Sequence, residues 1–201
     1  RLEAQQTSRL MADLRLRALR TQMNPHFLFN SLNAIQECII THQNDAAVTY
    51  LAKFSKLVRL ILEHSDKPLI PLSKELETLR LYLDIEALRF TETFTYELVA
   101  DTHLEPSLIS IPPMLVQPYA ENAIWHGLLH KPGERKLRLR FTSDEDSLFV
   151  TIEDNGIGRQ AAAQQQVPRK EGYASRGMQL IDERLTVIKE GQHDNLGSVK
   201  V

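Results

Sequence analysis

The spacing of apolar residues in the first third of the chain predicts two amphipathic helices. Residues 1–40 are charged at first and then amphipathic, and from position 47 onward apolar residues recur every three or four positions up to about His64. The polar stretch 41–45 between them is short, so the two helices are expected to form an antiparallel hairpin. One hairpin is too small to bury both of its apolar seams, which favours a homodimeric four-helix bundle. The alternative is that the hairpin packs on the rest of its own chain.

The apolar period changes from 3.6 to 2 in the second half of the chain. Residues 65–73 contain two prolines and are interpreted as a linker, and a third helix follows with Leu76, Leu79, Leu83, Ala87 and Phe90 on one face. Apolar and polar residues then alternate, as in strands, over 94–98, 137–141 and 148–152.

Further helices and a mobile loop complete this second half. A helix is expected from about Pro113 to Trp125, with a bend at Pro118, and another from about 177 to 190. Residues 155–176 have no periodicity and are interpreted as a loop, and the last residues begin another strand. The predicted fold class is α+β, with a sheet covered by helices after the hairpin.

One histidine lies on a wholly polar side of the first hairpin helix. His26 follows Pro25 and precedes three large apolar residues. At helical spacing it shares its side with Gln22, Asn30, Asn33 and Glu37, between apolar stripes formed by Leu16, Leu19, Met23 and Phe27 and by Leu28, Leu32, Ile35 and Ile39. His26 is therefore expected to face water and to be available for chemistry.

Composition and charge narrow the class of protein only slightly. The chain is 42% hydrophobic and 25% charged, and its net charge of −2 gives no basic field for nucleic acid or for an anionic membrane. Its single cysteine excludes an internal disulfide, and no run approaches the roughly 20 apolar residues needed to span a bilayer. The chain begins without methionine, which suggests the soluble end of a longer protein.

Three short segments of the second half together indicate a nucleotide site. In "ENAIWHG" (121–127), Asn122 and His126 share one helix face, and in "EDNGIGR" (153–159), Asp154 ends a strand and is followed by glycines. A carboxylate there can accept a hydrogen bond from an exocyclic amine. In "SRGMQL" (175–180), Gly177 begins a helix, whose free N–H groups suit a phosphate. Each segment alone is common, but the three in this order form a stronger signal.

The segments "NPHFLFNSLNAI", "PPMLVQPYAENAIWHG", "DNGIGR" and "GMQLIDERL" make the chain resemble the sensor histidine kinases of the LytS type. The second half of that family has the ATP-binding fold of gyrase, the MutL proteins and the heat-shock chaperone ATPases. The resemblance implies a signal helix and a dimerisation and histidine phosphotransfer hairpin in 1–66. It implies an ATP-binding catalytic domain in 67–201 with a truncated last strand. It also implies the cytoplasmic part of an inner-membrane sensor, anchored only through an upstream segment absent from this chain.

The same resemblance assigns roles to individual residues. His26 would attack the γ-phosphate of ATP and pass the phosphoryl group to an aspartate of a response regulator receiver domain. Asn30, one turn on, is proposed to orient the imidazole or a hydrolytic water. Asn122 would hold Mg²⁺. The remaining nucleotide-binding residues would be Glu121, His126, Asp154 on the adenine amino group, Gly156, Gly158, Arg159 and Gly177, with 159–176 as the lid.

Departures from the family pattern leave two alternatives open. Phe27 follows the histidine where many kinases have an acidic base, and Trp125 occupies the place of a phosphate-binding lysine, so His126, Lys131, Arg159 or Arg176 would have to supply the charge. A degenerate, dimerising signalling module is therefore one alternative. An ATP hydrolase or ATP-gated clamp is the other, although Pro118 stands where such enzymes carry their water-activating glutamate.

Overall fold

The computed structural model describes residues 25–90, 94–144 and 147–158. The chain divides between Lys67 and Pro68 into two compact units, each described by itself. Helices and strands are both present, so the predicted α+β class is confirmed. None of the helices in the described ranges is long and apolar enough to cross a membrane.

The first unit is a helical hairpin of α2 (Pro25–Ile40) and α3 (Asn44–His64), which pack on each other. The tight turn between them is centred on His42, whose φ of 59° is left-handed. The N–H of His42 donates to the Ile39 carbonyl and that of Gln43 to the Cys38 carbonyl, which is the bonding pattern of a Schellman cap. The cap ends α2 and lets α3 begin three positions earlier than the apolar pattern predicts. The buried apolar residues of the hairpin are Phe27, Ile35, Ala47, Tyr50, Leu57, Leu60 and Ile61.

The second unit begins with a short strand pair inside the segment predicted to be a linker. Strand β1 (Ile70–Pro71) pairs antiparallel with β3 (Ser110–Ile111), and α4 (Leu72–Arg89) follows directly. The first N–H groups of α4, at Leu72 and Ser73, donate to carbonyls of the loop that precedes β3. Because a helix has no partners of its own for these groups, the loop satisfies them and fixes the start of α4.

The buried face of α4 differs from the predicted one. Leu79 and Leu83 are buried as expected, but Leu76 and Ala87 are only partly buried, and Glu75 and Glu86 are each 1% exposed. The apolar pattern did not predict this face, because the pattern assumes that acidic side chains are exposed to solvent. Both carboxylates have partners inside the unit. Those of Glu75 are backbone N–H groups far along the sequence, and that of Glu86 is Arg89 on the next turn of α4.

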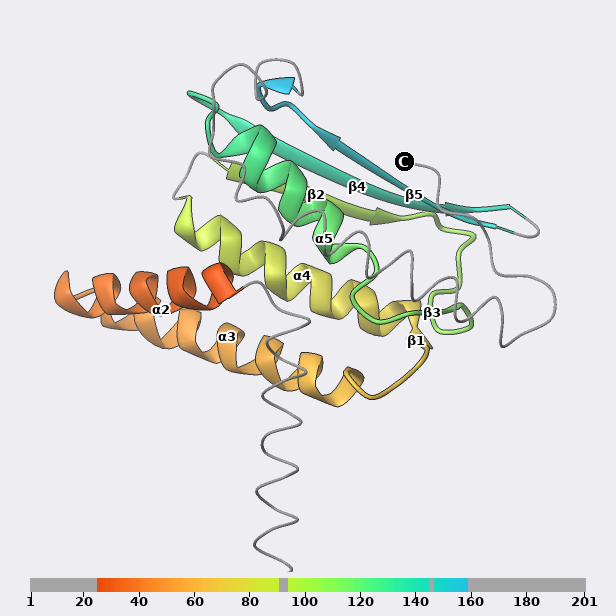
Figure 1. Ribbon diagram of the computed structural model, residues 1–201, viewed down its shortest axis with the longest axis horizontal. Helices are drawn as coiled ribbons and strands as arrows, with labels where there is room; N and C mark the ends of the chain where they lie inside the picture. The colour runs from red at the N-terminus through yellow and green to blue at the C-terminus, as the bar shows by residue number, and fades with distance from the viewer. Residues whose placement is uncertain (1–24, 91–93, 145–146, 159–201) are drawn as a thin grey trace, which may run out of the picture. The chain divides into compact units, whose positions relative to one another are not determined.

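A three-stranded sheet forms the centre of the second unit. Strand β4 (Arg135–Ser143) pairs in parallel with β2 (Phe94–Ala100) and antiparallel with β5 (Leu148–Asp154), giving the order β2-β4-β5. The three strands are those that the alternating pattern predicts. Alternate residues of β4, namely Leu137, Leu139 and Phe141, are buried, and the residues between them are exposed. Helix α4 runs along one face of this sheet (Figure 1).

The helix predicted from Pro113 begins later and changes type. Helix α5 spans Gln117–Asn122 and continues as a π-helical turn, η2 (Ala123–Leu128). Pro118 lies in the first turn of α5, where its missing N–H has no helical partner to lose, so the expected bend at Pro118 is wrong. Met114 instead adopts a left-handed φ of 57° ahead of the helix.

Candidate functional site

His26 lies on the surface of the hairpin unit, and its ring is hydrogen-bonded to Asn30. The imidazole is exposed, while the next residue, Phe27, is 1% exposed and anchors this turn of α2 in the hairpin. Nδ2 of Asn30 lies 3.1 Å from Nδ1 of His26. The contact spans one helical turn, so it follows directly from the i, i+4 spacing of the two residues. It holds Nδ1 on the helix side of the ring.

A buried carboxylate supports the start of helix α5, which carries Glu121 and Asn122 of the "ENAIWHG" segment. The Glu75 side chain of α4 accepts the N–H groups of Met114 at 2.8 Å and Val116 at 3.1 Å, immediately before α5. Burial raises the pKa of Glu75 to about 7, although these backbone donors act in the opposite direction. Glu75 of α4 therefore acts as a capping residue for the start of α5. It fixes the position of that helix, and with it the position of Asn122.

The predicted residues 121, 122 and 126 lie around the junction of α5 and η2. Asn122 ends α5 and is partly buried, Glu121 accepts a hydrogen bond from Gln117 Nε2 at 3.2 Å, and His126 is exposed on η2. A π-helical turn widens the helix and is found frequently at functional sites. Here it contains Gly127, the last residue of the "ENAIWHG" segment.

Gly127 lets the end of β5 and the residues that follow it contact η2. A Cβ placed on Gly127 would lie 2.6 Å from Oδ1 of Asp154, and one on Gly156 would lie 2.4 Å from the Gly127 carbonyl carbon. The Ile157 N–H also donates to the Gly127 carbonyl at 3.1 Å. The Cβ at Gly156 would meet the Gly127 backbone, so the "ENAIWHG" and "DNGIG" segments approach each other backbone to backbone there. At Gly127 the near neighbour is the Asp154 side chain.

The Asp154 carboxylate is exposed beside this contact. Its Oδ1 accepts the Gly156 N–H at 2.9 Å, and Oδ2 has no hydrogen bond to any described residue. Because Gly127 has no side chain, the carboxylate remains open to a polar group of a ligand. Gly158, with a φ of 78°, has no neighbour within 4 Å of an added Cβ in the described part of the chain, but its backbone conformation suits glycine.

Trp125 packs toward α4 and forms part of a buried cluster. The Arg89 guanidinium lies 4.4 Å from the Trp125 ring centroid and 2.9 Å from a Glu86 carboxylate oxygen. Burial raises the pKa of Glu86 to about 7, Arg89 lowers it, and Glu121 raises it. The residue in the place of a phosphate-binding lysine is thus a packing element that connects η2 with α4, a role that the sequence reading did not assign.

Some predicted site residues cannot be placed, and two contributors were missed. Arg159, Gly177 and the lid 159–176 lie outside the described residues. Gly127 and Asn155 lie inside the motifs but had been given no role. A glycine within a helix costs roughly 1 kcal/mol relative to alanine, which was a usable signal for Gly127. Asn155 had no such signal, since asparagine before glycine is a common turn pair.

A magnesium nucleotide suits this set of residues. The described residues hold no cluster of three His, Cys, Asp or Glu side chains that would bind a metal alone. Mg²⁺ in phosphoryl-transfer sites is held by one or two protein oxygens together with the substrate's phosphates and water. The amide oxygen of Asn122 is a ligand of that kind, and the open Asp154 carboxylate suits an exocyclic amine.

Comparisons with known proteins point to one family. The family described as "Histidine kinase" matches residues 14–94. Sensor protein LytS of Bacillus subtilis (strain 168) is 38% identical over 156 residues, which are 78% of this chain and 26% of that protein. Sensor protein LytS of Oceanobacillus iheyensis is 34% identical over 157 residues, with the same coverage of both chains. The chain spans about a quarter of the length of the curated relatives it matches.

A solved histidine kinase domain, from the Erythrobacter litoralis EL346 blue-light activated histidine kinase, is also similar. It is 17% identical, 85% of each chain is covered, and the TM-score is 0.43. The resemblance predicted from the sequence motifs is confirmed by the family match and the curated relatives: this chain is a relative of the LytS-type sensor histidine kinases.

Proposed function

We propose that this chain is the catalytic core of a two-component sensor kinase, which phosphorylates His26 from ATP and passes the phosphoryl group to an aspartate of a response regulator. The observation that carries the proposal is the exposed imidazole of His26 with its Nδ1 held by Asn30. A histidine that served only packing would be buried with the apolar seams. We further propose, from the family resemblance, that the core works in the cytoplasm and is attached to a membrane through an upstream segment.

The chemistry needs a ring nitrogen with a free lone pair. Neutral imidazole has one such nitrogen, and its reference pKa near 6.5 keeps much of it neutral at pH 7. The Nε2 lone pair of His26 forms a bond to the γ-phosphorus while the bond to the β–γ bridging oxygen breaks, and ADP leaves with those electrons. Phosphohistidine then gives the phosphoryl group to a carboxylate oxygen and regains its lone pair.

Asn30 decides which ring nitrogen is the nucleophile. In the structure the Nδ2 group of Asn30 faces Nδ1, and an NH₂ donor there would leave the ring proton on Nε2. A half-turn of the amide places its oxygen against Nδ1 instead, so that the ring proton resides on Nδ1 and Nε2 carries the nucleophilic lone pair. The proposal therefore gives Asn30 the acceptor orientation, in which it also stabilises the positive charge that develops on the ring during attack. This would replace the acidic base that the neighbouring Phe27 cannot provide.

The second unit would bind the nucleotide. Asp154 would accept a hydrogen bond from the adenine amino group, with Gly127, Gly156 and Gly158 leaving room for the base. Asn122 would supply an oxygen to Mg²⁺, whose charge offsets that of the phosphates. Glu121 and His126 would line the same end of the site, and Arg159 and Gly177 would lie on the phosphate side.

The hairpin unit would associate with a second copy to form the four-helix bundle. Six large apolar side chains of α2 and α3 are between 49% and 67% exposed. Water contact of this many apolar groups is unfavourable by about 25 cal/mol per Å². The six are Phe29, Leu32, Ile39, Ile40, Val48 and Leu51.

Labelling with γ-phosphate-labelled ATP tests the proposal. The His26→Gln variant should lose acid-labile, alkali-stable labelling and keep its affinity for Mg-ATP, while His103→Gln, an exposed control, should label normally. Labelling of His26→Gln at the wild-type rate would refute the assignment. Asn30→Ala should label roughly fivefold more slowly, because one hydrogen bond is worth about 1 kcal/mol, and Asn30→Asp, which can only accept, should recover the rate. An inactive Asn30→Asp would refute the acceptor orientation.

A further inference from the structure

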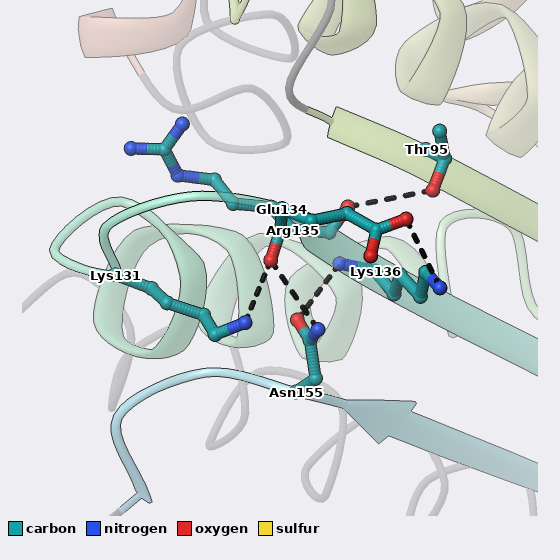
Figure 2. A network of polar contacts seen from close by, with 6 residues as sticks. All are labelled: Thr95, Lys131, Glu134, Arg135, Lys136 and Asn155. Atoms are coloured by element: carbon teal, nitrogen blue, oxygen red, sulfur yellow. Dashed lines mark hydrogen bonds and ion pairs between the residues drawn. The ribbon is translucent and has the colours of Figure 1, made fainter.

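Asn155 lies between the proposed adenine-binding aspartate and Gly156, but its side chain bonds to a neighbouring strand. Its Oδ1 accepts the Lys136 N–H at 2.8 Å, and its Nδ2 donates to the Glu134 carbonyl at 3.3 Å. Its own N–H donates to the Lys136 carbonyl at 3.2 Å. Figure 2 shows the two side-chain bonds of Asn155, which hold the residue that follows β5 against the start of β4. The side-chain oxygen, the side-chain NH₂ and the backbone N–H of Asn155 therefore all bond to the backbone of residues 134–136.

The start of β4 is itself tied to the end of η2. Lys131 Nζ donates to the Glu134 carbonyl at 2.6 Å, so that oxygen accepts from both Lys131 and Asn155 (Figure 2). Arg135 Nε donates to the Leu128 carbonyl at 2.8 Å, and the Lys131 N–H donates to the same oxygen at 3.1 Å. Asn155 is therefore bonded to a backbone segment whose position relative to η2 is already set.

The residues on either side of Asn155 carry the contacts of the site. Gly156 donates to Asp154 Oδ1, and Gly127 of η2 touches both Gly156 and the Asp154 carboxylate. A closed ring results, running from η2 through the 131–135 turn and Asn155 to the 154–157 loop and back to Gly127. Asn155 is the side chain that connects the 154–157 loop to the start of β4, and the hydrogen bond from this loop to η2, from Ile157 to Gly127, is made by backbone.

We infer that Asn155 is a positioning residue for base recognition: it fixes the loop so that the free Oδ2 of Asp154 meets the amino group of a 6-aminopurine. The inference rests on the proposed function, because it assumes that Asp154 binds adenine. Asn155 touches no part of the nucleotide itself. Its bonds are exposed to solvent, where water replaces a lost partner, so their loss should change the direction of the carboxylate more than the stability of the fold.

Binding to two nucleotides separates this role from simple support of the fold. Mg-ATP and the triphosphate of purine riboside, which lacks the 6-amino group, are titrated by calorimetry against the 201-residue chain and its variants. Wild type should prefer ATP. Asn155→Ala should weaken ATP binding about tenfold, because the charge-assisted hydrogen bond between Asp154 and the adenine amino group is lost. Its affinity for the purine riboside triphosphate should stay within twofold of wild type. Asp154→Ala should show the same loss of preference, and Asn155→Ala should add nothing to it.

Two further variants sharpen the result. Asn155→Asp keeps an acceptor for the Lys136 N–H but turns a second acceptor toward the Glu134 carbonyl, so it should behave like alanine. Thr95→Val is the matched control. Thr95 Oγ1, on β2, donates weakly, at 3.5 Å, to the Arg135 carbonyl at the start of β4, and Thr95 does not bond to the 154–157 loop. It should leave the preference unchanged.

Two outcomes would overturn the inference. An Asn155→Ala protein with wild-type preference for ATP would show that the carboxylate keeps its direction without Asn155. An equal loss for both nucleotides, with a lowered Tm, would show a merely structural residue. If wild type binds neither nucleotide and Asp154→Ala changes nothing, the proposed function itself fails and this inference fails with it.

Discussion

Replacing Gly127 with alanine is expected to weaken ATP binding while the protein stays folded. The new Cβ would lie 2.6 Å from Oδ1 and 3.2 Å from Cγ of Asp154. Ordinary contact begins at 3.4 Å, so the carboxylate must move by about 0.8 Å. The carboxylate ends an exposed side chain, which can rotate away, so the clash should cost little stability.

The affinity should fall because the moved carboxylate no longer meets the adenine amino group. A hydrogen bond stretched by that amount from a normal length is no longer one. A bond with a charged acceptor is worth about 1.5–3 kcal/mol, so Kd for Mg-ATP should rise about 10- to 100-fold. In the same helix, alanine is intrinsically favoured over glycine by up to roughly 1 kcal/mol, which offsets part of any strain.

Calorimetric ATP binding and urea unfolding of three glycine variants measure both quantities. Gly127→Ala should lose ATP affinity alone. Gly156→Ala should lose affinity and stability together, because its Cβ would meet the backbone of Gly127 at 2.4 Å and backbone cannot rotate away. Gly133→Ala, with φ of 77° and open space around it, should lose stability alone. An ATP affinity of Gly127→Ala within twofold of wild type would refute the placement of Asp154 at the adenine.

Three other measurements follow from the buried charges and the apolar surface. Burial raises the pKa of Glu75 from 4.5 to about 7, so the folded protein holds this proton more tightly than the unfolded chain. The contribution of Glu75 to the free energy of unfolding should therefore be fully present near pH 4.5 and below and should decline by up to about 3 kcal/mol as the pH rises to 7. Glu75→Gln should remove this part of the pH dependence in urea titrations, and the exposed control Glu105→Gln should not. Arg89→Met should lower the free energy of unfolding by about 3 kcal/mol, because it leaves the buried Glu86 without its ion-pair partner. Adding Glu86→Gln should recover much of this loss, and equal free energies of unfolding for the single and double variants would contradict the pairing. Leu32→Gln should shift the sedimentation equilibrium from dimer toward monomer, and an unchanged dimer would place the self-association elsewhere.

Periodicity alone was sufficient for the elements whose faces meet water. The all-polar side around His26 predicted its exposure, and the alternation of 137–141 predicted which residues of β4 are buried, because these patterns reflect a boundary between core and solvent along one element. The motif order likewise predicted that the segments at 122 and 154 belong together. The roles proposed for those residues come from the family resemblance.

The tertiary structure decided features that depend on partners far along the chain. Glu75 reads as a surface residue, yet it is buried because two backbone N–H groups about forty positions later need an acceptor. The α4 face was misassigned for the same reason, and Trp125 acquired its role only through the guanidinium of Arg89. A local pattern records how one segment divides between core and water, but it does not record which donor or ring another segment will bring to that position.

The contact between Gly127 and Gly156 shows the same division. From the sequence each glycine is a gap in the side-chain pattern, compatible with a turn or a weak helix. Gly156 is necessary because the Gly127 backbone lies within 2.5 Å of where its Cβ would be, and at Gly127 the Asp154 carboxylate lies 2.6 Å from where a Cβ would be. Both contacts exist only once η2 and the end of β5 are packed together. The sequence by itself therefore determined the elements and the candidate chemistry, and the packing of distant segments determined how the candidate residues are held.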